Sequence, residues 1–179
     1  LIGFSSDEGV KRNKGRLGAA DAPDAIRAQL ANLPVYQALS IADLGTVICV
    51  DGDLEKAQAE LADQVEVCLS SGSQPIVLGG GHEVAFGSFS GLFQYVQKHQ
   101  PNQTIGIINF DAHFDLRPLP VGGSSGTMFK QIADECSDLG LDFRYLCMGI
   151  QKYSNTEELF KTARELGAVY LLEKDIDSR

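Results

Sequence analysis

Hydrophobic and polar residues follow two patterns along the chain. Short apolar runs rich in β-branched residues predict strands, and we expect them at 1–4, 38–50, 75–80, 104–111, 143–150 and 168–172. Longer stretches in which apolar residues recur every three or four positions predict amphipathic helices. These fall at 21–33, 53–70, 82–98, 127–139 and 155–167. The Gly- and Ser-rich residues 5–20 and 118–126 are predicted to be loops.

Strands that alternate with helices indicate βαβ units around a mostly parallel sheet. The predicted strands are apolar on both faces, as a sheet covered by helices on each side requires. No repeat or linker interrupts residues 1–179, so we expect one three-layer α/β/α domain. In such sheets, ligands bind at the carboxyl ends of the strands.

The predicted strand 104–111 ends in three polar residues at alternate positions. Asp111, His113 and Asp115 lie on the same side if the chain stays extended. Three unpaired polar heads at one point are costly, and a divalent cation satisfies all of them. A solvated loop is the alternative, but the spacing and the preceding strand favour a metal site.

A second polar corner follows the predicted strand 75–80. Three glycines, Gly79 to Gly81, precede His82 at the expected start of a helix. A Gly-rich turn of this kind can cradle phosphate, but "GGGHE" matches neither phosphate-binding glycine motif. With the later DxHxD motif, His82 is better interpreted as a fourth ligand. Two imidazoles and two carboxylates suit Mn²⁺, Zn²⁺, Fe²⁺ or Ni²⁺.

Composition narrows the possible partners. The formal net charge of −9 argues against a nucleic-acid-binding protein. The basic cluster Lys11, Arg12, Lys14 and Arg16 is at most a small anion site. No apolar run is long enough to span a membrane. Four widely spaced cysteines without a CxxC motif predict free buried thiols in a cytoplasmic protein.

The motifs resemble those of the ureohydrolase family, which includes arginases, agmatinases and formimidoylglutamases. "GGGHE", "NFDAHFDLR" and the N-terminal "GVKRNKGRLGAADAP" occur in the family's order. The segments "DAHFDLR" and "MGIQKYSNTEELF" are most similar to those of formimidoylglutamases. The resemblance implies an arginase-like fold and a metal-dependent hydrolase of linear amidines. It further implies two Mn²⁺ ions and cleavage of N-formimidoyl-L-glutamate to L-glutamate and formamide in histidine degradation.

The resemblance also implies roles for individual residues. His82 and Asp115 share one Mn²⁺, and His113 binds the second. Asp111 bridges both ions and supports the hydroxide that attacks the substrate. Arginases and agmatinases carry a histidine after Ser-Gly-Asn, whereas this chain reads Ser125, Gly126, Thr127 without one. This departure favours the formimidoylglutamase interpretation and leaves the proton-transfer residue unassigned.

The family's third metal motif, Asp-x-Asp-x-x-Asp, has no match in this chain. Asp175 and Asp177 are interpreted as a surface loop, and Asp51 and Asp53 as a turn and a helix N-cap. We therefore expect a single metallohydrolase domain at 1–179 whose C-terminal part, with the remaining ligands, is missing. If the protein ended near Arg179, a non-catalytic metal-binding domain of the same fold would be the better interpretation.

The substrate that the resemblance implies is a small molecule with two carboxylates, which guanidinium groups recognise well. Arg117, Arg16 and Ser125 are the expected contacts, since Arg117 follows Asp115 by two residues and the others lie in loops. Another ureohydrolase acting on a guanidino compound (agmatinase, guanidinobutyrase or arginase) is the alternative. A homo-oligomer is possible, although the sequence indicates no interface.

Overall fold

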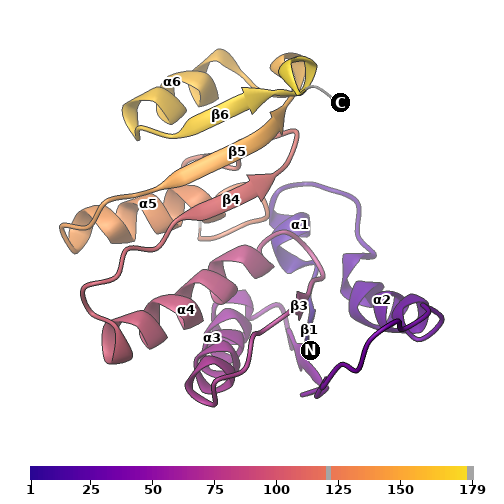
Figure 1. The fold of residues 1–179 in the computed structure, drawn as a ribbon. Coiled ribbons are helices and arrows are strands. Elements are labelled where there is room, and N and C mark those ends of the chain that lie inside the picture. Colours follow the sequence, from indigo (N-terminus) through magenta and orange to yellow (C-terminus); the bar gives the residue numbers. More distant parts are fainter. Residues whose placement is uncertain (120–121, 177–179) are drawn as a thin grey trace. The chain divides into compact units, whose positions relative to one another are not determined.

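The computed structural model describes residues 1–119 and 122–176. The chain divides into two compact units. Unit 1 comprises residues 1–101 and 123–125, and unit 2 comprises residues 102–122 and 126–179. Each unit contains its own three-stranded sheet (Figure 1).

The sheet of unit 1 has the strand order β2-β1-β3, and its strands are parallel. The central strand β1 covers Ile2–Ser5, β2 covers Thr46–Ile48, and β3 covers Val77–Leu78. Gly3 lies opposite Thr46 on one side and Leu78 on the other. The alternate β1 residues Ile2 and Phe4 are fully buried, so this strand forms the centre of the unit.

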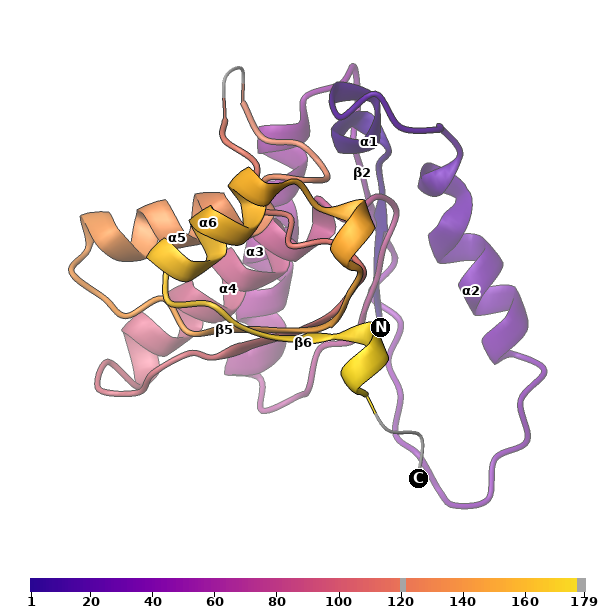
Figure 2. The same cartoon turned by 90° about the horizontal axis from the view of Figure 1, so that it is seen from above.

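Helices cover both faces of this sheet. Helix α2 (Ala22–Leu30) lies on one side and α3 (Leu54–Ser70) on the other (Figure 2). The apolar stripe of α3 packs against the strands through Leu54, Leu61 and Val65. At the start of α3, the Asp53 side chain accepts a hydrogen bond from the Lys56 N–H at 3.1 Å. This is the N-cap that the sequence predicts.

Helix α4 (Val84–His99) packs closely against α3. Its two interior glycines explain how the backbones approach each other. A Cβ atom at Gly91 would lie 2.4 Å from the Ala62 carbonyl oxygen, and one at Gly87 would lie 2.9 Å from that of Gln58. Glycine lowers the helix propensity of α4 at these two positions. It is nevertheless required there, because any larger residue would push the two helices apart.

The sheet of unit 2 has the order β4-β5-β6, again parallel. Its strands are β4 (Ile107–Phe110), β5 (Tyr145–Ile150) and β6 (Val169–Leu172). Helices α5 (Met128–Asp138) and α6 (Glu157–Glu165) lie on the same face of it (Figure 2). Phe129 of α5 stacks on Tyr145 at 4.5 Å between ring centroids, and Phe160 of α6 meets Tyr170 edge-on at 5.7 Å.

The opposite face of this sheet departs from the prediction that both faces are covered. Ile108 pairs with Leu146, which pairs in turn with Val169; likewise Phe110 pairs with Met148, which pairs with Leu171. Phe110 is 78% exposed, Ile108 64% and Val169 61%. Among the described residues of unit 2, no helix packs on this apolar face, since α5 and α6 both lie on the other side.

The α/β class with parallel strands is confirmed, and every predicted helix is present. Three details differ. A short helix α1 (Glu8–Arg12) occupies the predicted loop 5–20, because Glu8 pairs with Lys11 and Arg12 across one turn. The strands β2 and β3 are shorter than predicted, since strand pairing with β1 limits them to three and two residues. Single 3₁₀ turns occur at Ala19–Asp21 (η1), Lys152–Ser154 (η2) and Glu173–Asp175 (η3).

Two further predictions concern the cysteines and membrane-spanning segments. All four cysteines are free thiols, and three of them are buried, as predicted. Among the described residues, the helices are all too short or too polar to cross a lipid bilayer.

Candidate metal centre

The polar segment of unit 2 begins where β4 ends. The Asp111 amide continues the sheet by donating to the Met148 carbonyl at 3.0 Å. Its carboxylate then accepts from the His113 amide at 2.8 Å and lies 3.2 Å from His113 Nδ1. The carboxylate therefore closes a tight turn that ends the strand.

The extended path predicted for residues 111–115 is wrong. Residues 112 and 113 bend, and Asp115 adopts a left-handed conformation with φ of 50°. Hydrogen bonds hold this bent path, since the Asp111 carboxylate accepts from the His113 amide and the Asn155 side chain binds the backbone of Ala112 and Phe114. Phe114 and Leu116 are buried to 0% and 1% exposure.

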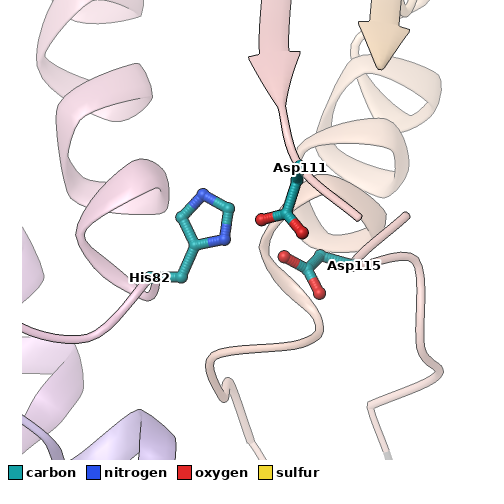
Figure 3. A group of neighbouring side chains, drawn as sticks. All are labelled: His82, Asp111 and Asp115. Atoms are coloured by element: carbon teal, nitrogen blue, oxygen red, sulfur yellow. The ribbon is translucent and has the colours of Figure 1, made fainter. Parts of the chain in front are cut away.

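The two aspartates meet despite the turn. One carboxylate oxygen of Asp111 and one of Asp115 lie within 4.8 Å of each other (Figure 3). Metal–oxygen bonds of about 2.1 Å place two oxygens on one ion at most about 4.2 Å apart. The pair lies near this spacing, and a shared divalent cation would also remove the repulsion between two neighbouring negative charges. His113 points elsewhere, toward solvent and Asp111, with its side chain 52% exposed.

His82, which Figure 3 also labels, belongs to unit 1. It follows β3 and directly precedes α4. The glycines before it are required by contact with β1. The Gly80 and Gly81 amides donate to the Phe4 and Ser6 carbonyls at 2.8 and 2.7 Å, and a Cβ atom at Gly80 would lie 2.2 Å from the Ser6 oxygen. Since these amides already have acceptors, this turn is not a phosphate cradle.

Glu83 is a residue that the sequence analysis missed. Its side chain is fully buried, and Oε1 accepts from the Ser6 hydroxyl at 3.1 Å and the Gly9 amide at 2.9 Å. Burial raises the pKa of this carboxyl group. Gly9 and Gly81 border the carboxylate, where a Cβ atom on either would lie within 2.6 Å of it. Glu83 thus ties the turn that carries His82 to the loop after β1.

A buried polar cluster supports the turn at 111–115 from beneath. The Tyr145 hydroxyl donates to the Phe114 carbonyl and accepts from Asn109 Nδ2, both at 3.1 Å. The Cys147 thiol lies 3.5 Å from the His113 carbonyl oxygen. Burial raises the pKa values of both the Tyr145 hydroxyl and the Cys147 thiol, so each stays protonated and able to donate. The sequence showed these side chains only as part of a strand.

The predicted substrate residues lie in both units. Arg16 is exposed in unit 1, where the Ser125 amide also donates to the Gly9 carbonyl at 3.0 Å. Arg117 is exposed in unit 2, and its amide donates to the Gly126 carbonyl at 3.0 Å. Their role in binding substrate remains a prediction.

The basic cluster is not a free anion site. Arg12 hydrogen-bonds both Glu55 and Glu8, and Lys11 also pairs with Glu8 at 2.9 Å. The pairing with Arg12 lowers the pKa of Glu55. These acidic partners neutralise half of the cluster.

The other aspartates discussed from the sequence that the structure describes, and His99, lie away from the aspartates at the end of β4 in sequence and occupy turns or a helix end. Asp51 lies in a turn with φ of 54°, and Asp175 ends the 3₁₀ turn η3. Asp177 lies outside the described residues. The His99 ring lies 3.1 Å from the Ser70 hydroxyl and packs against Tyr95, as expected for a structural histidine.

Comparisons with known proteins agree with the motifs. The sequence model of the arginase family matches residues 1–179. The formimidoylglutamases of Paraburkholderia xenovorans and Clostridium tetani are each 51% identical to this chain over 98% of its length. The chain spans only 57% and 53% of those proteins, so it corresponds to about half of each.

A solved structure shows the same fold. The crystal structure of Trypanosoma cruzi formiminoglutamase with Mn²⁺ is 28% identical and superposes with a TM-score of 0.82. The match covers 97% of this chain and 59% of the T. cruzi chain. With the family model and the curated relatives, this similarity shows that the chain belongs to the arginase family.

Proposed function

We propose that this chain is part of a formimidoylglutamase, which hydrolyses N-formimidoyl-L-glutamate to L-glutamate and formamide. The observation that carries the proposal is the identity of about half of all residues to curated formimidoylglutamases over nearly the whole chain. The same enzyme class provides the solved structure with a TM-score of 0.82. Since the chain spans about half of its relatives, the activity is proposed for the complete protein.

The proposed metal ligands are His82, Asp111, His113 and Asp115. Support comes from the carboxylate pair at 111 and 115, which each offer an oxygen within 4.8 Å of the other, near the spacing that a shared cation requires. Manganese is the proposed metal, since the T. cruzi relative was crystallised with it and a mixed nitrogen and oxygen set suits it. When bound, two Mn²⁺ ions supply a nucleophile derived from water at neutral pH and stabilise negative charge that develops on the substrate.

Other residues of the chain are proposed to bind the substrate or to hold the metal ligands in position. Arg117 and Arg16 offer guanidinium groups to the two carboxylates of formimidoylglutamate, and Ser125 offers a hydroxyl group. The His113 amide donates a hydrogen bond to the Asp111 carboxylate at 2.8 Å, and this bond fixes the position of one carboxylate oxygen. The four free cysteines fit a reducing compartment, and we propose the cytoplasm.

The test uses the full-length protein, measured for bound manganese and for formamide release from formimidoylglutamate. Asp111→Asn is expected to lose metal and at least about 100-fold of kcat, because a neutral amide is a poor ligand for a hard cation. Asp138→Asn, at the exposed end of α5, is the matched control and should change neither. Near-normal activity of Asp111→Asn would refute the site. Activity on a guanidino compound instead of formimidoylglutamate would refute the substrate.

A further inference from the structure

The turn formed by residues 111–115, here named the aspartate turn, is bound by a side chain from another part of unit 2. That side chain is Asn155, which lies between η2 and α6. Its Nδ2 donates to the Ala112 carbonyl at 2.8 Å, and its Oδ1 accepts from the Phe114 amide at 3.1 Å. The two hydrogen bonds hold the backbone on either side of His113.

The position of Asn155 is itself fixed. Its Nδ2 also donates to the Gln151 carbonyl at 2.9 Å, one 3₁₀ turn earlier. The Gln151 amide in turn donates to the Ala112 carbonyl at 3.0 Å, directly after β5 ends. The side-chain amide of Asn155 therefore connects the end of β5 to the aspartate turn and uses three of its four hydrogen-bonding sites.

Only an asparagine supplies this combination at this length. An aspartate keeps the acceptor for the Phe114 amide but places a negative charge beside the Ala112 and Gln151 carbonyls. An alanine keeps neither contact and leaves the partly buried Phe114 amide without this acceptor.

We propose that Asn155 is a positioning residue for the metal centre. It holds the aspartate turn in the conformation that brings the Asp111 and Asp115 carboxylates together. This inference rests on the proposed function, because it assigns those carboxylates to Mn²⁺. Asn155 acts through the backbone of Ala112 and Phe114 and does not itself bind metal or substrate.

The turn's conformation explains why such a residue is needed. Asp115 adopts φ of 50°, a left-handed backbone conformation that is unfavourable for a residue with a side chain. The 111 and 115 carboxylates also repel each other before metal binds. Contacts at Ala112 and Phe114, between the two aspartates, oppose both tendencies by restricting how far the turn can open.

The experiment compares the full-length protein with Asn155→Ala, Asn155→Asp and the control Asn32→Ala. Asn32 also donates its side-chain amide to a backbone carbonyl, that of Ala28 at 2.7 Å, but it lies in unit 1. Three kinds of measurement are made: amide hydrogen exchange of residues 110–117 without metal, the Mn²⁺ dissociation constant by calorimetry, and kcat and KM at saturating Mn²⁺.

Asn155→Ala is expected to speed exchange at residues 112–116 and to weaken Mn²⁺ binding about 10- to 100-fold, as removal of supporting contacts around metal ligands does. KM should change little, since Asn155 does not touch the substrate. Asn155→Asp should lie between alanine and wild type. Asn32→Ala should match wild type in all three measurements.

Unchanged Mn²⁺ affinity in a folded Asn155→Ala variant would overturn the inference. If that variant fails to fold, the Asn155→Asp affinity decides in the same way. Failure of the proposed function has a different signature, because the wild-type protein itself would then bind no Mn²⁺ or release no formamide. Failure of this inference alone would leave the wild type active and the variants equal to it.

Discussion

A single buried carboxylate organises the loop after β1 in unit 1. Glu83 accepts hydrogen bonds from Ser6 and Gly9 on Oε1, while Oε2 has no partner among the residues that the structure describes. Gln58 of α3 adds a hydrogen bond to the Glu83 carbonyl at 2.8 Å. The residue beside a proposed ligand therefore fixes the backbone from which that ligand extends.

The contribution of Glu83 can be measured by substitution. Glu83→Ala leaves the buried Ser6 hydroxyl and Gly9 amide without this acceptor, and we expect the free energy of unfolding to fall by about 2–4 kcal/mol. Glu83→Gln keeps the Oε1 acceptor and should lose less. Urea denaturation measures both, with Glu60→Ala at an exposed α3 position as the control. Equal stability of the Glu83→Ala and Glu60→Ala variants would contradict the assigned role.

At the scale of elements, side-chain hydrogen bonds join segments that strand pairing alone leaves loosely connected. Arg27 of α2 donates from Nε and Nη2 to both carboxylate oxygens of Asp43, each at 2.8 Å. It also donates to the Thr46 hydroxyl of β2 and to the Gly45 carbonyl, again at 2.8 Å. One guanidinium group thus joins a helix to the start of its neighbouring strand.

This arrangement predicts a pH dependence. The hydrogen bonds from Arg27, followed by one from the Gly45 amide, lower the pKa of Asp43 from 3.8 to about 2. Because the folded value lies below the unfolded one, the stabilisation is complete above about pH 4 and is lost as the pH falls through about 2. Arg27→Gln should raise the pKa of Asp43 toward its ordinary value in a carboxyl NMR titration. Arg144→Gln, which alters an ion pair in unit 2, should leave it unchanged, and an unshifted Asp43 in Arg27→Gln would refute the attribution.

At the scale of the whole molecule, the apolar face of the β4-β5-β6 sheet is the feature that the strand pattern does not explain. Exposed apolar surfaces that continue across neighbouring strands promote association. Ile108, Phe110, Val169 and Leu171 are all exposed on that face, and the register aligns them into two rows.

We expect the 179-residue chain by itself to self-associate through this face. Replacing Ile108 and Phe110 together by threonine keeps β propensity but removes much apolar area, and it should shift the population toward monomer in sedimentation velocity. The matched control replaces Leu39 and Ile41, which are also exposed but lie outside any strand or helix. A wild-type chain that stays monomeric at about 0.1 mM, or equal effects of the two double variants, would contradict the expectation.

The helices and strands were largely predictable because their periodicity is strong. The stripe of α3 and its Asp53 cap follow directly from local sequence, as does the preceding turn at Asp51. Strand lengths were not predictable, because they depend on pairing with β1, which engages three residues of β2 and two of β3. The short helix α1 was missed because its stabilising Glu8 contacts lie within a segment rich in glycine and charge.

The proposed ligand types were identified from spacing and strand context, but the path of residues 111–115 was not. A strand-like path would place three side chains on one side, whereas the structure has a left-handed Asp115 and a His113 directed at Asp111. Hydrogen bonds to the Asp111 carboxylate and to Asn155, a residue distant in sequence, hold this path.

By itself, the sequence determined the α/β class, the order of elements and the residue types at the end of β4, because these depend on local periodicity and on chemistry carried by single side chains. Tertiary structure decided which backbone groups the polar side chains satisfy. Glu83 binds the loop after β1, and Asn155 and Tyr145 hold the aspartate turn across 41 and 31 residues of chain. Such contacts follow from how buried donors and acceptors are paired once the elements pack, and no local pattern in the sequence encodes that pairing.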